Sequence, residues 1–408
     1  MARLYPFRAL RPRPADAARV AAVPYDVVST DEARALADGN PLSFLHVSRA
    51  EIEFPAGTDP YAPAVYDRAS KNFAELRQKA LLLEDEPSLY LYRLRMGSHE
   101  QTGLAACFSI DEYDRDVIKK HERTRRDKED DRTRHMLALG AQTGPVFLTY
   151  KASAQVDDIA ARATKTAPLY DFEAPDGVRH TLWRITGGDR DALVATFARI
   201  PALYIADGHH RAASAARART EVAAKPRPSS SDGADATTML AVAFPHNQVQ
   251  ILPYNRIVKD LGGLTPDAFL TAVKQRFDIA QGKPEPSKAG EISMYFDRAW
   301  HTLRPKMRPE RSDAIAALDV SVLQDQLLAP VLKIADVRTD KRIDFVGGAR
   351  GTKELERLVD SGKAAVAFSL YPVSINDLMT VSDAGAIMPP KSTWFEPKLR
   401  DGLLIHLI

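Results

Sequence analysis

The chain has 408 residues, which is enough for two or three domains of ordinary size. Lys and Arg number 56 against 54 acidic residues, and a net charge of +2 excludes binding of nucleic acid or anionic membrane through overall charge. The single cysteine, Cys107, excludes an internal disulfide and a Cys-ligated zinc site, and no apolar run is long enough to span a membrane. The N-terminus has no signal-peptide pattern, so we expect a cytoplasmic protein without nucleic-acid or membrane partners.

Residues 20–30 form an apolar run that is interrupted at Pro24-Tyr25-Asp26. Pro24 cannot donate a backbone hydrogen bond and so excludes a central strand at this point, which places Tyr25 and Asp26 at a strand end facing a cleft. An Asx turn made by Asp26 is an equally good interpretation. The cap residues that follow predict a helix over 30–37.

Apolar periodicity predicts the next elements. They are a strand over 42–48, a helix over 61–82, a hairpin of strands 89–95 and 103–110, a strand over 144–150, a helix from Ser153 and a strand over 181–185. Glu51 follows the first of these strands and is a candidate catalytic carboxylate.

Residues 118–135 carry charges of alternating sign, which is typical of a solvated helix with i,i+4 ion pairs. The same stretch favours a second interpretation, because helical spacing would bring a carboxylate, an imidazole and several cations to one face, as phosphoryl transfer requires. The residues concerned are His121, Glu122, Thr124, Lys128, Asp131 and Arg132.

A strand, a turn and a helix meet near residue 208. The apolar run 202–206 is rich in strand formers and the alanine-rich stretch 212–219 predicts a helix. Free N–H groups and the positive end of the helix dipole would then favour a phosphate beside the residues between them. Alternatively, the aspartate is only a helix cap and the histidines lie on the surface. These residues are Asp207, Gly208, His209, His210 and Arg211.

The Pro-, Ser- and Gly-rich stretch 223–235 predicts a surface loop, and 239–244 with 249–258 predicts an antiparallel pair. Asn255 and Arg256 interrupt the second apolar run. A buried ion pair and contact with a ligand explain them equally well.

From residue 261 the pattern predicts a second α/β unit. Its expected helices are 269–277, 313–329, 353–359 and 375–381, and its expected strands are 291–297, 300–304, 342–346, 365–370 and 402–408. The glycines of 347–353 do not fit a phosphate-binding P-loop. A stiff loop, 388–398, offers three further candidate ligands for phosphate, or is simply a packed crossing loop; they are Lys391, Ser392 and Thr393.

Five sequence blocks, in order, resemble the signature of the bacterial and archaeal family known as domain of unknown function 1015. They are Val23-Pro-Tyr-Asp-Val, His121-Glu-Arg-Thr with Asp131-Arg132, Ala206-Asp-Gly-His-His-Arg, Ile251-Leu-Pro-Tyr-Asn-Arg and Met388-Pro-Pro-Lys-Ser-Thr-Trp-Phe-Glu-Pro-Lys-Leu.

The Asp207-Gly-His-His-Arg211 block is also similar to the motif of the ParB/sulfiredoxin-like superfamily, and most closely to that of archaeal free-serine kinases. This resemblance implies that the motif binds the phosphates of ATP or ADP, with Mg²⁺, and that a separate acidic residue activates the serine hydroxyl. Glu51 and Glu122 are the candidates for that residue.

The expected fold is therefore α/β (mixed α+β), with a ParB/sulfiredoxin-like part at 1–260 packed on a second α/β part at 261–408. The expected activity is phosphoryl transfer to a small free amino acid such as serine. A phosphatase acting on phosphoserine and a nucleotide-binding regulator without turnover are the alternatives.

Overall fold

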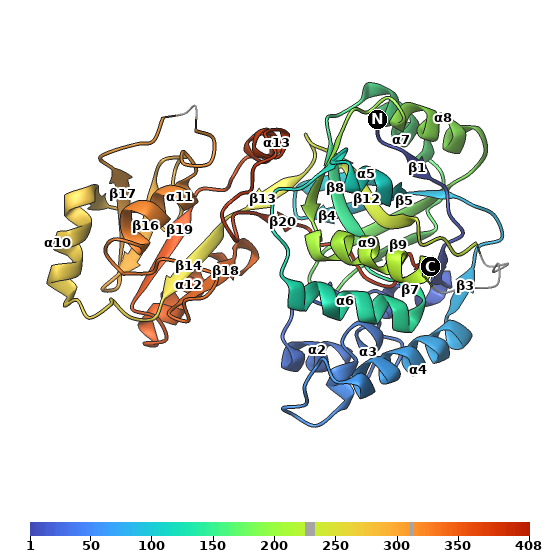
Figure 1. Ribbon diagram of the computed structural model, residues 1–408, viewed down its shortest axis with the longest axis horizontal. Coiled ribbons are helices and arrows are strands. Elements are labelled where there is room, and N and C mark those ends of the chain that lie inside the picture. Colours follow the sequence, from blue (N-terminus) through green and yellow to red (C-terminus); the bar gives the residue numbers. More distant parts are fainter. Residues whose placement is uncertain (225–232, 311–312) are drawn as a thin grey trace. The chain divides into compact units, whose positions relative to one another are not determined.

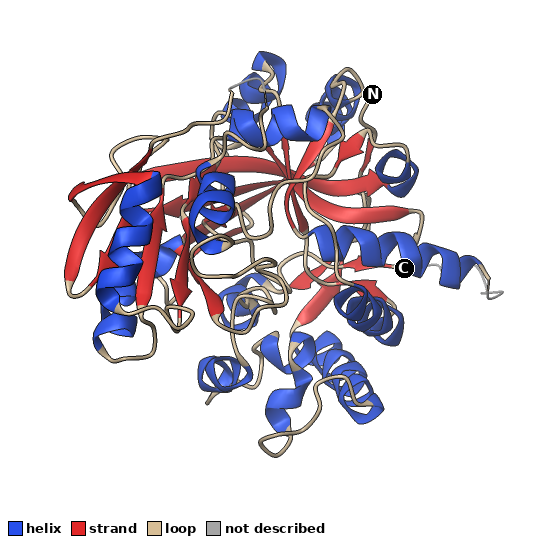
Figure 2. Cartoon of the chain, turned by 60° about the vertical axis from the view of Figure 1, so that its left-hand side comes forward, coloured by secondary structure: helices blue, strands red, loops and turns tan. Residues whose placement is uncertain are grey.

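The computed structural model describes residues 1–224, 233–310 and 313–408. Figure 1 labels its elements in chain order, and Figure 2 shows helices and strands intermixed along the chain. The loop expected at 223–235 lies largely at 225–232, outside the described residues. No helix within the described ranges is long and apolar enough to cross a membrane.

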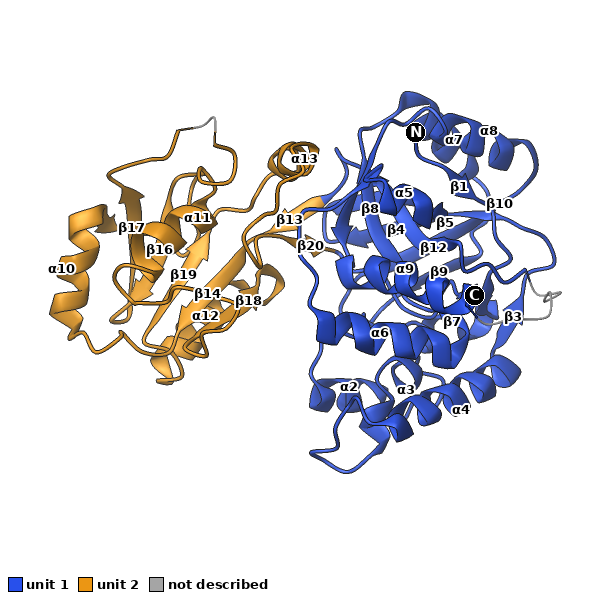
Figure 3. Cartoon of the chain, in the orientation of Figure 1, with its two compact units in different colours: residues 1–249, 397–408 blue, residues 250–396 orange. Residues whose placement is uncertain are grey.

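The chain forms two compact units (Figure 3). Unit 1 comprises Met1–Val249 and Pro397–Ile408, and unit 2 comprises Gln250–Glu396. The structure therefore differs from the expected division at residue 260, because unit 2 is an insertion and the last twelve residues return to unit 1. The entering strand and the leaving strand of unit 2 pair with each other, Gln250 opposite Glu396, which brings the two connections together.

The strands of unit 1 are β1 (Leu4–Tyr5), β2 (Leu10–Pro12), β3 (Leu81–Leu83), β4 (Leu89–Met96), β5 (His99–Ser109), β6 (Ile118–Lys119), β7 (Ala141–Gln142), β8 (Val146–Tyr150), β9 (Tyr170–Glu173), β10 (Arg179–Ile185), β11 (Leu203–Asp207), β12 (Thr238–Pro245) and β21 (His406–Leu407). Its α-helices are α1 (Ala17–Val20), α2 (Thr30–Ala37), α3 (Leu45–Ser48), α4 (Pro63–Lys79), α5 (Ile110–Asp114), α6 (Arg126–Leu139), α7 (Ala154–Ala163), α8 (Gly187–Phe197) and α9 (His209–Ala223); η1 (Pro14–Asp16) and η2 (Ala50–Glu53) are short 3₁₀ helices.

The large sheet of unit 1 is mixed, with strand order β6-β11-β8-β12-β5-β4-β10-β9 and β1 paired to β5. The pairs β6–β11 and β8–β12 are parallel, and the others are antiparallel. Strand β12 is buried at every residue, and this explains its nearly continuous apolar sequence. Helices α5, α7, α8 and α9 pack their small and aliphatic side chains into one core with this sheet.

Several predicted elements of unit 1 are present. The hairpin of β4 and β5 forms in register, and α2 begins at a reciprocal capping box between Ser29 and Glu32. The predicted strand at 42–48 is wrong, because Leu45 and Val47 lie in helix α3, which packs against α4. A short apolar run is compatible with a buried helix as well as with a strand. Here the segment packs against helix α4 and is itself helical.

The other corrections concern longer stretches. The predicted pair 239–244 with 249–258 does not form, since β12 pairs with β5 and β8 in unit 1 while the chain crosses to unit 2. The expected helix over 118–135 is a short strand, β6, followed by a loop, and α6 begins only at Arg126.

The strands of unit 2 are β13 (Gln250–Leu252), β14 (Tyr254–Val258), β15 (Phe277–Gln281), β16 (Ile292–Phe296), β17 (Ala299–Pro305), β18 (Ile343–Gly347), β19 (Val366–Leu370) and β20 (Trp394–Glu396). Its helices are α10 (Pro266–Arg276), α11 (Asp319–Leu323), the π-helix η3 (Gln324–Leu328), the 3₁₀ helix η4 (Gly348–Arg350), α12 (Gly351–Asp360) and α13 (Ile375–Asp383).

Unit 2 has a six-stranded sheet of order β15-β17-β16-β19-β14-β18 in which each pairing is antiparallel. The expected alternation of strand and helix is present from β18 to β20, within antiparallel pairings. Helix α12 packs on one face through Leu355, against Ile257 and Ala367. The strand predicted over 402–408 is reduced to β21, which pairs with β7 in unit 1. The molecule is thus a mixed α/β protein.

Candidate functional site

The strand–turn–helix at Asp207–Arg211 forms as predicted, at the end of β11. Gly208 is the N-cap of α9, with a φ of 92° that L side chains rarely adopt. A Cβ at this position would lie 3.4 Å from Cζ of Arg211. Asp207 is not the cap; its Oδ1 accepts a hydrogen bond from the Gly208 N–H at 2.8 Å. The turn therefore requires glycine for its backbone conformation, whereas the guanidinium lies at an ordinary van der Waals distance from the position of a Cβ.

His209 and His210 connect α9 to the loop that precedes α6. Nε2 of His209 accepts from the backbone N–H of His121 at 3.4 Å, and Nε2 of His210 accepts from that of Arg125 at 3.0 Å. His209 is only 5% exposed, which excludes the surface location for this residue, and its ring packs edge-on against His121. Burial and the neighbouring imidazole lower the pKa of His209 well below its usual value. Its geometry is that of a neutral, loop-positioning histidine.

Arg211 carries a buried guanidinium at the start of α9. Its Nη1 donates to the carbonyl of Pro145, while Nε and Nη2 have no hydrogen-bond partner. Nη2 lies 3.8 Å from Oδ1 of Asp26, too far for a hydrogen bond. Burial opposes the charge, but Asp26, Asp207 and Asp401 raise the pKa of Arg211. Arg211 is therefore a positively charged side chain held in place by Pro145, and two of its nitrogens can still donate hydrogen bonds.

Tyr25 and Asp26 lie beside this cation. Tyr25 is 7% exposed, and its ring stacks under the guanidinium of Arg132, whose Cζ is 4.0 Å from the ring centroid. Arg132 is in turn paired with Asp131 at 2.7 Å. The side chains of Tyr25, Asp26, Arg132 and Arg211, predicted from three separate blocks, therefore form one charged cluster in unit 1.

Two residues that the sequence analysis missed complete this cluster, both from the returning C-terminal segment. Lys398 Nζ donates to Oδ2 of Asp207 at 3.0 Å and, despite the burial of that carboxyl, holds the pKa of Asp207 below its usual value. Asp401 is 3% exposed, and its Oδ1 has no hydrogen-bond partner. Burial, opposed by Arg211, raises the pKa of Asp401 to about 7. The dipeptide Asp401-Gly402 repeats the Asp-Gly signal of residues 207 and 208 and was the available sequence clue.

Gly144 provides the room for Asp401. A Cβ at residue 144 would lie 2.5 Å from Oδ1 of Asp401. The close approach of this carboxylate to the backbone before β8 thus depends on glycine.

The two candidate glutamates differ in their surroundings. Glu51 is 6% exposed and pairs with Arg49 at 2.7 Å. Glu122 is partly exposed, and its Oε2 lies 3.8 Å from Nδ1 of His209. Thr124 donates to the carboxylate of Glu129. Because His121, Glu122 and Thr124 precede α6, the expected common helical face with Asp131 and Arg132 does not exist.

The other five candidates lie in unit 2. Oδ1 of Asn255 accepts from the N–H of Leu370 at 3.2 Å. Nη2 of Arg256 donates to the carbonyl of Pro390 at 3.3 Å, and no ion pair of Arg256 is found among the described residues. Lys391 stacks on Tyr254, and the Ser392 hydroxyl donates to the carbonyl of Pro389; Thr393 follows in the same loop.

The described residues do not provide a complete set of metal ligands. Within the described residues no group of three or more His, Cys, Asp or Glu side chains is arranged to hold a metal ion. Mg²⁺, however, commonly binds through one or two carboxylates together with substrate phosphates. Asp26 and Asp207 are candidate carboxylates, because both are close enough to Arg211 to raise its pKa.

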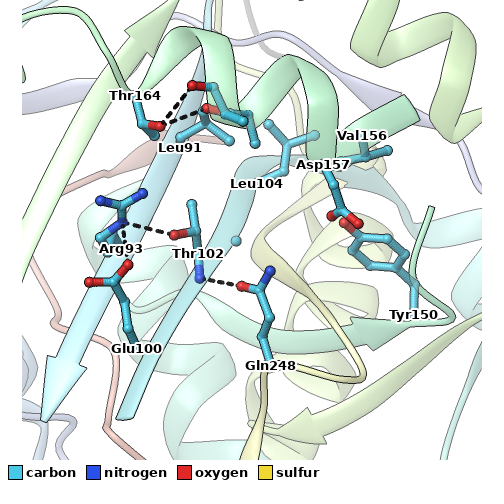
Figure 4. Close-up of a pocket in the computed structure, with 13 residues that line it drawn as sticks. Leu91, Arg93, Glu100, Thr102, Leu104, Tyr150, Val156, Asp157, Thr164 and Gln248 are labelled. Atoms are coloured by element: carbon cyan, nitrogen blue, oxygen red, sulfur yellow. Dashed lines mark hydrogen bonds and ion pairs between the residues drawn. The ribbon is translucent and has the colours of Figure 1, made fainter. Parts of the chain in front are cut away.

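A cavity of about 300 Å³ lies elsewhere in unit 1, over strands β4 and β5 and beside α7 (Figure 4). Within it Arg93 donates to Thr102 at 3.0 Å and lies 3.3 Å from Glu100, and the Thr102 N–H donates to Gln248 at 2.9 Å. None of the predicted site residues lines this cavity. Arg93, Thr102, Glu100 and Gln248 already bond to one another, so the charged cluster remains the stronger candidate.

Residues 4–321 match the family model described as "Protein of unknown function (DUF1015)". The chain belongs to this family. The resemblance to this family is thereby confirmed, and four of the five sequence blocks lie within the matched residues; the block that begins at Met388 lies outside them. No curated protein matches this DUF1015 chain.

Solved structures give distant similarities to this DUF1015 chain. SbnI from Staphylococcus aureus, with a C-terminal truncation, has 13% identity and a TM-score of 0.40, over 74% of this chain and 87% of that one. A free serine kinase in complex with AMP has 12% identity and a TM-score of 0.36, over 73% and 92%. A conserved hypothetical protein from Pyrococcus furiosus has 14% identity and a TM-score of 0.37, over 74% and 95%.

Proposed function

We propose that this protein transfers a phosphoryl group from a nucleotide, ATP or ADP, to the hydroxyl of a small free amino acid such as serine. The observation that carries the proposal is Arg211, a buried cation at a helix N-terminus with two nitrogens that lack acceptors. Guanidinium donors and helical N–H groups together are a favourable environment for phosphate oxygens. The motif's similarity to that of free-serine kinases points to the same chemistry.

Asp401 is the proposed general base. A carboxyl whose pKa is about 7 is well matched to accept a proton at neutral pH, and burial, opposed by Arg211, gives Asp401 that pKa. In the proposed step the serine oxygen attacks the terminal phosphorus and its proton passes to Asp401. The bond from that phosphorus to the bridging oxygen breaks, which leaves ADP from ATP or AMP from ADP.

Other residues of the cluster have positioning roles in this proposal. Lys398 holds Asp207 in place, and the two histidines hold the 121–125 loop against α9. Asp26, beside the guanidinium of Arg211, and Tyr25, beside that of Arg132, lie on the side proposed for the amino acid. Mg²⁺ would enter with the nucleotide, held by its phosphates and by Asp26 or Asp207, and would neutralise phosphate charge.

The decisive experiment measures phosphoserine formed from serine, Mg²⁺ and either ATP or ADP. The Arg211→Lys variant is expected to lower kcat/KM about 100-fold, because a guanidinium donor to the transferred group is lost. Arg217→Lys is the matched control, the same substitution on the same helix at a residue paired with Asp130. Its activity is expected to stay within about twofold of wild type.

A second assay, with phosphoserine as the substrate and no nucleotide, separates the alternatives. Release of phosphate from phosphoserine without nucleotide would establish a phosphatase and contradict the proposal. Nucleotide binding with neither product would favour a regulator. Equal activity of the two arginine variants would remove Arg211 from the mechanism.

A further inference from the structure

Arg256 lies on β14, between β18 and β19 of the unit 2 sheet, and is buried with most of its hydrogen-bond donors unsatisfied. It is 1% exposed, and its Nε and Nη1 have no hydrogen-bond partner. The one hydrogen bond of its guanidinium, from Nη2 to the carbonyl of Pro390, is 3.3 Å long. At least three N–H bonds of a charged group therefore lack acceptors, where buried donors are normally satisfied.

The charge of Arg256 is also unopposed. Burial lowers the pKa of Arg256 to about 9, so the side chain remains charged at pH 7. Within residues 1–224, 233–310 and 313–408 no carboxylate contributes to that pKa or forms an ion pair with this arginine. By comparison, Arg342 of the same unit pairs with Asp340 at 2.7 Å. An isolated buried cation is costly and calls for a counter-charge.

The surroundings of Arg256 resemble one side of a ligand site. Its guanidinium lies 5.6 Å from the ring centroid of Phe345, and Tyr254, on the same face of β14, contacts both Phe345 and Trp394. A second cation is close by, because Nζ of Lys391 lies 5.4 Å from the Tyr254 ring.

The loop that carries Lys391 has an unusual backbone conformation. Lys391 has a φ of 58°, unusual for a side chain of its size, directly after two prolines. Backbone strain of this kind occurs at ligand-contacting segments. Every contact described for Arg256 and Lys391 is made within unit 2.

We propose that unit 2 binds a small oxyanion, a phosphate or carboxylate group, on Arg256 with Lys391 as the second cation. The anion's oxygens would accept the unsatisfied N–H bonds and its charge would balance the guanidinium. This inference stands on unit 2 alone and does not depend on the proposed phosphoryl transfer.

The test uses the full-length chain and three probes at equal ionic strength: inorganic phosphate, acetate and chloride. Thermal unfolding is measured for wild type, for Arg256→Met and for Arg338→Met. The last is the matched control, because Arg338 is 60% exposed and paired with Asp336. Hydrogen exchange of residues 254–258 is followed in wild type as a second measurement, which needs no variant.

We expect phosphate or acetate to raise the Tm of wild type and Arg338→Met by about 5 °C at concentrations about 100-fold above Kd, and to leave Arg256→Met unchanged. In chloride, Arg256→Met is expected to melt no lower than wild type, since it removes an unopposed charge. The oxyanion is also expected to slow exchange at 254–258.

Equal shifts in wild type and Arg256→Met would overturn the site, as would unaltered exchange at 254–258. The response to phosphate compared with that to acetate identifies the oxyanion class. An Arg211→Lys variant that loses activity but keeps the Arg256-dependent shift would separate this site from the phosphoryl-transfer proposal. Loss of the shift in Arg211→Lys would contradict the independence of unit 2.

Discussion

Asp401→Asn is the substitution that tests the charged cluster most directly. Asparagine keeps the shape of the side chain and removes the titrating carboxyl. In the folded protein burial and the charge of Asp26 raise the pKa of Asp401, Arg211 and Arg132 oppose the increase, and the resulting pKa is about 7. In an unfolded chain the pKa of an aspartate is about 3.9.

The difference between the pKa of Asp401 in the folded and in the unfolded protein sets the expected change in unfolding free energy. Roughly three pKa units correspond to about 4 kcal/mol of unfolding free energy. The folded state binds the proton more tightly than the unfolded state, so this contribution is fully present below pH about 4 and is lost as the pH rises to about 7. Relative to Asp401→Asn, wild type is therefore expected to lose about 4 kcal/mol between these pH values.

Urea unfolding of both proteins between pH 4 and 8, followed by far-ultraviolet circular dichroism, measures this difference. Buried histidines whose pKa burial lowers to about 4, such as His121 and His135, titrate in both proteins and largely cancel. Parallel stability curves would refute the reasoning. In the activity assay, kcat of wild type is expected to rise through pH about 7, and Asp401→Asn is expected to lose that rise.

Two further substitutions test the turn and the loop. Gly208→Ala is expected to cost about 1–3 kcal/mol in urea unfolding, because an L residue at φ 92° is strained, and to reduce activity. Gly187→Ala, at φ 58° with nothing within 4 Å, is the control and is expected to cost about 1–2 kcal/mol. Unchanged stability of Gly208→Ala would contradict the backbone requirement for glycine. His210→Ala is expected to accelerate hydrogen exchange of the Arg125 amide at least tenfold, and unchanged exchange would remove the positioning role.

Much of the local structure was predictable. The capping box at Ser29 and the hairpin of β4 and β5 depend on residues close together in the chain, and both form as expected. The strand at 42–48 was wrong because a short apolar run has no period of its own, and the helical neighbour α4 decided its conformation. The pairing of β12 was missed because its partners, β8 and β5, are about 95 and about 135 residues earlier in the chain.

The sequence by itself determined the turn at Gly208, because a left-handed residue between a buried strand and an alanine-rich helix is a local requirement. It also indicated that Arg211 belongs to a polar site. Only the tertiary structure decided what surrounds that arginine, since Asp26 and Asp401 reach it from opposite ends of the chain and their charges act through space. The same is true of Arg256. Its lack of a counter-charge results from which side chains pack around it in the folded sheet, and the neighbouring residues in the sequence do not indicate it.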